Sequence, residues 1–198
     1  MNLRNKVFGI AAASIFALSL GGSALAGTTT GEVNQKIATN EESADTLSAW
    51  LEGGAMREFT FSNTGDISYG SLTLGVKDER GSNAGWNVKL QVDPFEWTDE
   101  GQVVTGLVTD DIDSSGFHIY ESRTLTSNPG STANIGAVST SPGLKDEQVV
   151  LSAARGAGTG KYFQPYGVSL AIPALQAPGT YTADVTVTIA SAPGELGQ

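Results

Sequence analysis

The stretch RGAGTGKYF, residues 155–163, contains glycines and a lysine at a spacing close to that of a phosphate-binding loop. Such a loop requires Gly-x-x-x-x-Gly-Lys followed by Ser or Thr, because its backbone amides surround the phosphate and its hydroxyl binds magnesium. Here Arg155 occupies the first glycine position, and Tyr162 follows Lys161. The stretch therefore predicts a glycine-rich turn between two strands, and the sequence indicates no cofactor.

The stretch DDIDSSG has oxygen ligands at a spacing that could bind calcium. Asp111, Asp113 and Ser115 match the first, third and fifth positions of an EF-hand loop, where oxygens surround the ion. The twelfth position of that loop must supply a bidentate carboxylate, but Ser122 stands there and Glu121 is one residue early. The three residues are a candidate calcium site, and an ordinary turn is the alternative.

Residues that commonly carry catalysis are scarce. The chain has no cysteine and a single histidine, His118, and it lacks the Gly-x-Ser-x-Gly motif of many serine hydrolases. Transition-metal sites are not expected from so few nitrogen and sulfur ligands. The 21 acidic residues leave open a pair of carboxylates that the fold brings together, as in glycosidases. We predict that the protein is not an enzyme.

Aromatic residues are stronger candidates for ligand contacts. Phe95 and Trp97 lie in the polar stretch DPFEWTDEG, where an aromatic side chain has no evident role in a core. Trp86 alternates with Val88 and Leu90, which favours a buried indole, and a platform that stacks on a sugar is the alternative. Trp86, Phe95 and Trp97 are therefore candidate ligand contacts.

Strands must position these residues. In 71–78, 85–92 and 180–190, apolar residues fill every second position and polar residues lie between them. This period of two is typical of half-buried antiparallel strands, and clusters of Gly, Pro and Asn separate the stretches. Further strands are predicted over residues 56–61, 102–108, 117–125, 148–153 and 162–172, and one short helix is predicted around Trp50.

These strands are expected to form one domain behind an export signal. A short basic start precedes an uncharged run of 14 mostly apolar residues and then small residues, which is the pattern of a cleaved signal peptide over residues 1–26. The run is shorter than the ~20 residues that span a bilayer. Residues 27–44 are small and polar, so we expect a flexible or loosely docked leader. Residues 45–198 are then a single all-β domain, an antiparallel β-sandwich with at most one short helix.

The charge of the chain limits its partners. The net charge is −10, and removing Arg4 and Lys6 with the signal peptide would make it −12. An acidic surface repels nucleic acid and anionic lipid, so neither is an expected partner. The lack of cysteine argues against an acylated lipoprotein anchor, and no second apolar stretch is long enough to span a membrane. We expect a secreted, extracellular protein at the cell surface or in the cell wall.

Four segments, in order along the chain, resemble the WxL domain of bacterial surface proteins. LGVKDERGSNAGWNVKLQVDPF is similar to its first signature, RGAGTGKYF to its Gly-x-Gly segment, VSLAIP to its Leu-x-x-Pro strand, and GTYTADVTVTIASAP to its second signature. Valine replaces the usual leucine in the first signature, and valine and isoleucine replace the tryptophan and leucine of the second, so the chain resembles a divergent member. The signature positions are Asp78, Arg80, Gly81, Gly85, Trp86, Val88, Gly158, Gly160, Tyr181, Val187, Ile189 and Pro193.

The resemblance implies a role in attachment. WxL domains attach exported proteins non-covalently to the cell envelope, with peptidoglycan as the usual proposed ligand. The implied partner is a cell-wall polymer or another envelope protein, and Tyr181 becomes a further candidate ligand contact. The alternative is a structural subunit of a surface filament or coat that self-associates when residues 27–44 add a strand to a neighbouring copy.

The turn KDERG in the first signature is expected to be ordered by an ion pair. Asp78 and Arg80 are two residues apart and lie directly before Gly81. An exposed pair of this kind is expected to contribute less than ~1 kcal/mol.

Overall fold

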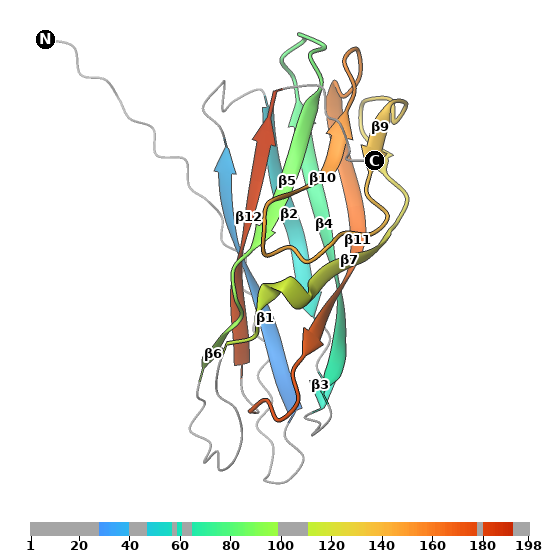
Figure 1. Cartoon of the computed structure of the whole chain (residues 1–198). Helices are drawn as coiled ribbons and strands as arrows, with labels where there is room; N and C mark the ends of the chain where they lie inside the picture. Colours follow the sequence, from blue (N-terminus) through green and yellow to red (C-terminus); the bar gives the residue numbers. More distant parts are fainter. Residues whose placement is uncertain are drawn as a thin grey trace, which may run out of the picture.

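Two β-sheets pack face to face in the computed structural model, which describes residues 28–39, 47–56, 59–60, 65–98, 111–177 and 180–191 (Figure 1). One sheet has the strand order β3-β1-β12-β5-β10-β9, with β6 also paired to β12, and the other has the order β2-β4-β11-β7, with β8 also paired to β11. This arrangement confirms the predicted all-β sandwich. Within the described ranges, helical structure is limited to the 3-10 turn η1, Ser114–Gly116.

The bounds of the strands follow the order of the chain. They are β1 Thr28–Thr39, β2 Leu47–Met56, β3 Phe59–Thr60, β4 Asp66–Asp78, β5 Trp86–Val92, β6 Glu96–Thr98, β7 Phe117–Ser122, β8 Thr126–Ser127, β9 Ile135–Ala137, β10 Gln148–Ala153, β11 Gly160–Ile172 and β12 Thr180–Ala190. The predicted strand over 148–153 coincides with β10, and the alternating stretches over 85–92 and 180–190 match β5 and β12. Strand β4 includes the stretch over 71–78 but begins earlier, at Asp66. The predicted strand over 102–108 lies outside the described residues.

The core lies between the two sheets and is built by the alternation read from the sequence. Every second residue of β5 is buried, from Trp86 to Val92, and the residues between them are half-buried. In β12, every second residue from Tyr181 to Ile189 is likewise buried, and the residues between them are half-buried except for the exposed Asp184. Because side chains alternate across a strand, one face of each sheet is apolar and the other is left for solvent. The core therefore uses all four hydrophobic positions of β5.

The second sheet is organised around the long pairing of β4 with β11. The pairing runs without a break from Gly160 opposite Asp78 to Ile172 opposite Asp66. Strand β2 pairs with β4 on one side, and β7 pairs with β11 on the other. The outward side chains of these four strands therefore form one continuous surface.

The short helix expected around Trp50 is wrong, because this stretch forms the middle of strand β2. Leu47, Ala49 and Leu51 are buried and Trp50 points to the opposite face, which is the period of a strand. Pairing with β4 places Trp50 opposite Gly75. Tertiary pairing overrides the local helical tendency of residues such as Leu and Ala.

The structure also differs from the flexible leader expected over residues 27–44. Strand β1 covers most of that segment and pairs in parallel with β12, from Thr30 opposite Thr180 to Thr39 opposite Ile189. A backbone ladder does not depend on apolar side chains, so a polar segment can form it. Residues 1–26 lie outside the described residues, and no helix among the described residues is long and apolar enough to cross a membrane.

Candidate functional site

The ion pair of the first signature is buried, which corrects the expectation of an exposed pair. The side chains of Asp78 and Arg80 are 1% and 11% exposed. Arg80 Nε donates to Asp78 Oδ1 and its Nη2 to Asp78 Oδ2, both at 2.9 Å. The guanidinium also donates to the Gly85 carbonyl at 3.0 Å and to the Ser191 hydroxyl. Arg80 thus ties the end of β4 to the start of β5 and to the end of β12.

Trp86 is fully buried, so the sugar-platform alternative is wrong for this residue. Its indole Nε1 donates to the carbonyl of Gly158 at 3.0 Å, and its ring centroid lies 6.0 Å from that of Tyr162. Gly158 has φ +87°, and a β-carbon there would overlap the indole and the methyl group of Ala153. The tryptophan of the first signature therefore positions the glycine segment, and a larger residue cannot replace Gly158 without displacing it.

Other signature positions are also structural. Gly85 has φ +81°, and a β-carbon there would lie 2.5 Å from the Ala153 carbonyl oxygen. Gly160 would place a β-carbon against the carbonyl of Pro129, whereas Gly81, with φ +67°, has open space around it. Val88, Val187 and Ile189 belong to the core, and Pro193 lies outside the described residues.

Two more of the candidate ligand contacts are buried. Phe95 is fully buried, bridges to Ile112 and packs against Phe117 with ring centroids 5.6 Å apart. Tyr181 is fully buried, and its hydroxyl donates to the Ala177 carbonyl at 2.8 Å. A ligand outside the protein therefore cannot reach either ring. Trp97 lies opposite Tyr181, packs partly against the core and keeps part of its surface exposed.

The two aspartates of the candidate calcium site, Asp111 and Asp113, accept hydrogen bonds from other groups of the protein. Asp113 caps η1 by accepting a hydrogen bond from the Ser115 amide at 2.7 Å, and its other oxygen accepts from Lys145 Nζ at 2.7 Å. These bonds, that from Lys145 above all, hold the pKa of the Asp113 carboxyl well below its usual range. Asp111 accepts from the Trp97 amide at 3.4 Å.

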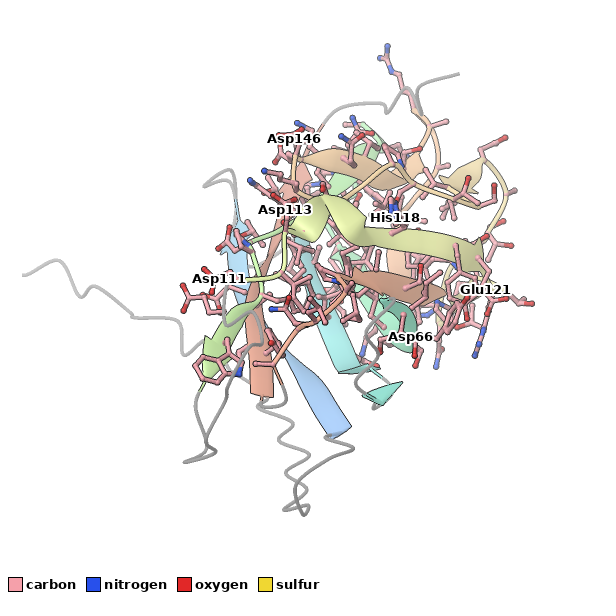
Figure 2. All side chains as sticks on the ribbon, turned by 60° about the horizontal axis from the view of Figure 1, so that its bottom comes forward. Asp66, Asp111, Asp113, His118, Glu121 and Asp146 are labelled. Carbon is pink, nitrogen blue, oxygen red and sulfur yellow. The ribbon has the colours of Figure 1, made fainter. Side chains whose placement is uncertain are left out.

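The described residues contain no group of three or more His, Cys, Asp or Glu side chains that could hold a metal ion. Figure 2 shows Asp111 and Asp113 beside η1, His118 along β7, and Glu121 and Asp66 well away from them. Residues that catalyse acid-base chemistry must converge within hydrogen-bond reach of one substrate. Asp111 and Asp113 are therefore not brought together with Glu121 and Asp66 (Figure 2).

The outer face of the β2-β4-β11-β7 sheet carries a pair of exposed tyrosines. Tyr69 of β4 and Tyr120 of β7 are each 39% exposed, and their rings meet edge to face with centroids 5.5 Å apart. Strand β11 lies between β4 and β7, and Gly167 of β11 leaves space for side chains of β7. A β-carbon at Gly167 would lie 2.8 Å from Tyr120 Cζ. It would also lie 2.5 Å from Glu121 Cγ, so the absence of a side chain at Gly167 makes room for Tyr120 and Glu121.

A second aromatic pair lies on the same face. Trp50 covers Gly75, where a β-carbon would overlap the indole, and meets Phe163 edge to face with centroids 6.1 Å apart. Lys161 Nζ lies 5.3 Å from the Trp50 ring centroid and 4.8 Å from that of Phe163, a cation–π arrangement. We call Trp50, Tyr69, Tyr120, Lys161 and Phe163 the aromatic face.

The aromatic face was missed in the sequence, although part of its signal is present there. Tyr69 shares the outward phase of β4 with Thr73, and Tyr120 shares that of β7 with His118. Aromatic residues in a polar phase mark an exposed surface. Trp50 could not be found in this way, because its stretch was interpreted as a helix.

Comparison with known families agrees with this architecture. A family model described as WxL domain surface cell wall-binding matches residues 25–193, which is most of the chain. No curated protein matches the sequence. The match includes all the signature positions and both sheets. The chain belongs to the WxL-domain family of surface cell wall-binding proteins.

Proposed function

We propose that this protein is a non-catalytic module that holds to glycan chains of the cell wall through its aromatic face. Membership of a surface cell wall-binding family supports attachment to the wall. The tyrosine pair is the observation that supports this choice of surface, since Tyr69 and Tyr120 are large and exposed and their rings pack edge to face. Exposed aromatic patches of this kind mark interaction surfaces.

The chemistry of this surface suits a sugar polymer. The C–H faces of a sugar ring are apolar and stack on aromatic rings, while the hydroxyls at its edge exchange hydrogen bonds with polar side chains. Gly75, opposite Trp50, and Tyr69 are six residues apart on β4, so the two aromatic pairs lie about 20 Å apart along the strand. An extended polymer can contact both pairs at once.

Such binding gains strength from repetition. Each stacked ring contributes about 0.5–1.5 kcal/mol, which is too little for firm attachment alone. A repetitive wall polymer offers many equivalent positions, so contacts that are individually weak act together. This explains how a surface without a deep pocket can retain a protein at the wall.

The test is co-sedimentation of the purified protein with insoluble cell wall. The double variant Tyr69→Ala/Tyr120→Ala should bind about tenfold more weakly, because two stacking contacts are lost. Leu175→Ala is the matched control, since Leu175 is 41% exposed and lies outside the aromatic face. Equal sedimentation of the double variant and the control would show that the wall binds elsewhere.

A second candidate function, a subunit of a surface filament or coat, has one observation in its favour. Strand β1 pairs with β12 along ten residues through backbone hydrogen bonds, and the same pairing can form with β12 of a second copy. Light scattering on the same samples separates the two candidates. Polymers that form without cell wall and do not sediment with it favour the subunit, and a monomer that sediments favours wall attachment.

A further inference from the structure

A hollow of about 260 Å³ lies at the end of the sandwich where three turns meet. The turns join β4 to β5, β8 to β9 and β10 to β11, and they lie together at the upper end of Figure 1. The volume is below the ~300–1,000 Å³ of sites for drug-sized ligands, so the hollow fits a single small ring. Its lining is Asn83, Ser131, Ala133, Asn134, Gly156, Ala157, Gly158, Thr159 and Tyr162.

The hollow is held in shape by hydrogen bonds between the turns. The Gly156 amide donates to the Asn83 carbonyl at 2.8 Å, and the Ala154 amide donates to the Asn134 carbonyl at 3.0 Å. The Thr159 hydroxyl donates to Asn83 Oδ1 at 3.0 Å. On the core side of the hollow, the Trp86 indole Nε1 donates a hydrogen bond to the Gly158 carbonyl at 3.0 Å. A ligand would therefore meet a preformed surface, with little ordering cost on binding.

The backbone at the hollow has unusual angles. Asn83 and Asn134 have φ of 52° and 60°, and Gly156 and Gly158 have φ of 86° and 87°. Among the described residues, three non-glycine residues have positive φ, and two of them line this hollow. Positive φ in side-chain-bearing residues concentrates at ligand sites, where the surrounding structure fixes it.

The chemistry of the lining is neutral. Amides and hydroxyls supply its polar groups, and none of the lining residues carries a charge. The Asn134 side-chain amide, which can both donate and accept, makes no hydrogen bond within the part of the chain that the structure describes. Two methyl groups, those of Ala133 and Ala157, lie in the same lining. A fitting ligand offers a small apolar group beside a neutral amide and hydroxyls.

We propose that this hollow is a second glycan subsite, specific for a neutral sugar that carries an acetamido group. The methyl of such a group can contact the two alanines, while its amide exchanges hydrogen bonds with the asparagine side chains. An extended peptide would instead run along a groove or a strand edge, whereas the turn backbones here are bonded to one another. This assignment rests on the proposed function, because it refines which sugar of the wall is bound.

Trp86 acts on this subsite as a positioning residue. It touches no ligand, but its indole fixes the Gly158 carbonyl and hence the floor of the hollow. The signature tryptophan and the glycine segment would then both shape the same subsite. The two lie 72 residues apart in sequence and meet only in the folded protein.

The test is NMR titration of the isotopically labelled protein with N-acetylglucosamine, and with glucose as the matched sugar lacking the acetamido group. N-acetylglucosamine should shift the amide signals of Gly156, Gly158 and Thr159 in a saturable manner, and glucose should not. Asn134→Gly removes the free amide yet tolerates the positive φ, and should weaken binding about tenfold. A short acetylated peptide is titrated in parallel.

The outcomes separate this proposal from the proposed function. The Tyr69→Ala/Tyr120→Ala variant should keep its response to N-acetylglucosamine while it loses sedimentation with cell wall. Absence of shifts at the hollow, equal binding of glucose, unchanged binding by Asn134→Gly, or a response only to the peptide would each overturn the subsite. None of these results would affect wall binding through the aromatic face.

Discussion

Arg80 joins three parts of the chain through one guanidinium group. Its partners are the Asp78 carboxylate, the Gly85 carbonyl and the Ser191 hydroxyl. Asp78 is 1% exposed, so its charge has lost almost all contact with water and depends on Arg80. A buried charge that loses its partner is far more costly than a broken surface ion pair.

Replacing Arg80 with Met should therefore lower the free energy of unfolding by about 3–5 kcal/mol, measured by urea denaturation. The double variant Asp78→Asn/Arg80→Met removes both charges and should recover part of the loss. A loss below about 1 kcal/mol in the single variant would mean that the pair behaves as an exposed one.

At the scale of elements, the turn between β10 and β11 holds the first signature and the glycine segment together. Gly156 and Gly158 have nearly equal φ, +86° and +87°, but different surroundings. A β-carbon at Gly156 has no neighbouring atom within 4 Å, whereas one at Gly158 overlaps the Trp86 indole. Alanine substitutions at the two glycines therefore have the same backbone cost but different packing costs.

Both Gly156→Ala and Gly158→Ala should lose about 1–2 kcal/mol for the left-handed backbone. Gly158→Ala should lose about 1–3 kcal/mol more, because the indole must move. Urea denaturation of the two variants side by side measures the difference. Equal losses would show that Trp86 does not constrain this turn.

At the scale of the whole molecule, buried tyrosines make the sandwich sensitive to alkali. The hydroxyls of Tyr162, Tyr166 and Tyr181 donate to backbone carbonyls at 2.7–2.8 Å, which only the protonated form can do. Burial raises the pKa of Tyr181 to about 12, and it also raises the pKa values of Tyr166 and Tyr162. An unfolded tyrosine has a pKa of about 10.

Stability should therefore hold steady up to pH ~10 and fall as the pH rises toward 12, because the unfolded chain loses its tyrosine protons first. The urea concentration at the midpoint of unfolding, measured over this pH range, tests this prediction. Tyr181→Phe should make the decline less steep, since it removes one of the titrating groups. A midpoint that stays constant between these pH values would contradict the assignment.

The alternation of apolar residues in β4, β5 and β12 determined the fold class from the sequence alone, because side-chain period and strand geometry are local properties. The order of the signature segments along the chain indicated the family, also from the sequence alone. For Trp86, the alternation of the strand predicted a buried side chain. It did not predict the hydrogen bond from the indole to the Gly158 carbonyl.

Only the tertiary structure decided which surfaces are free to bind. The sequence predicted Phe95 as a ligand contact and placed Trp50 in a short helix, yet pairing buries the first against Phe117 and turns the second outward over Gly75. The burial of Asp78 and the pairing of β1 with β12 were decided in the same way. The physical reason is that exposure depends on which distant strand lies alongside, and period two fixes the face of a residue but not what covers that face.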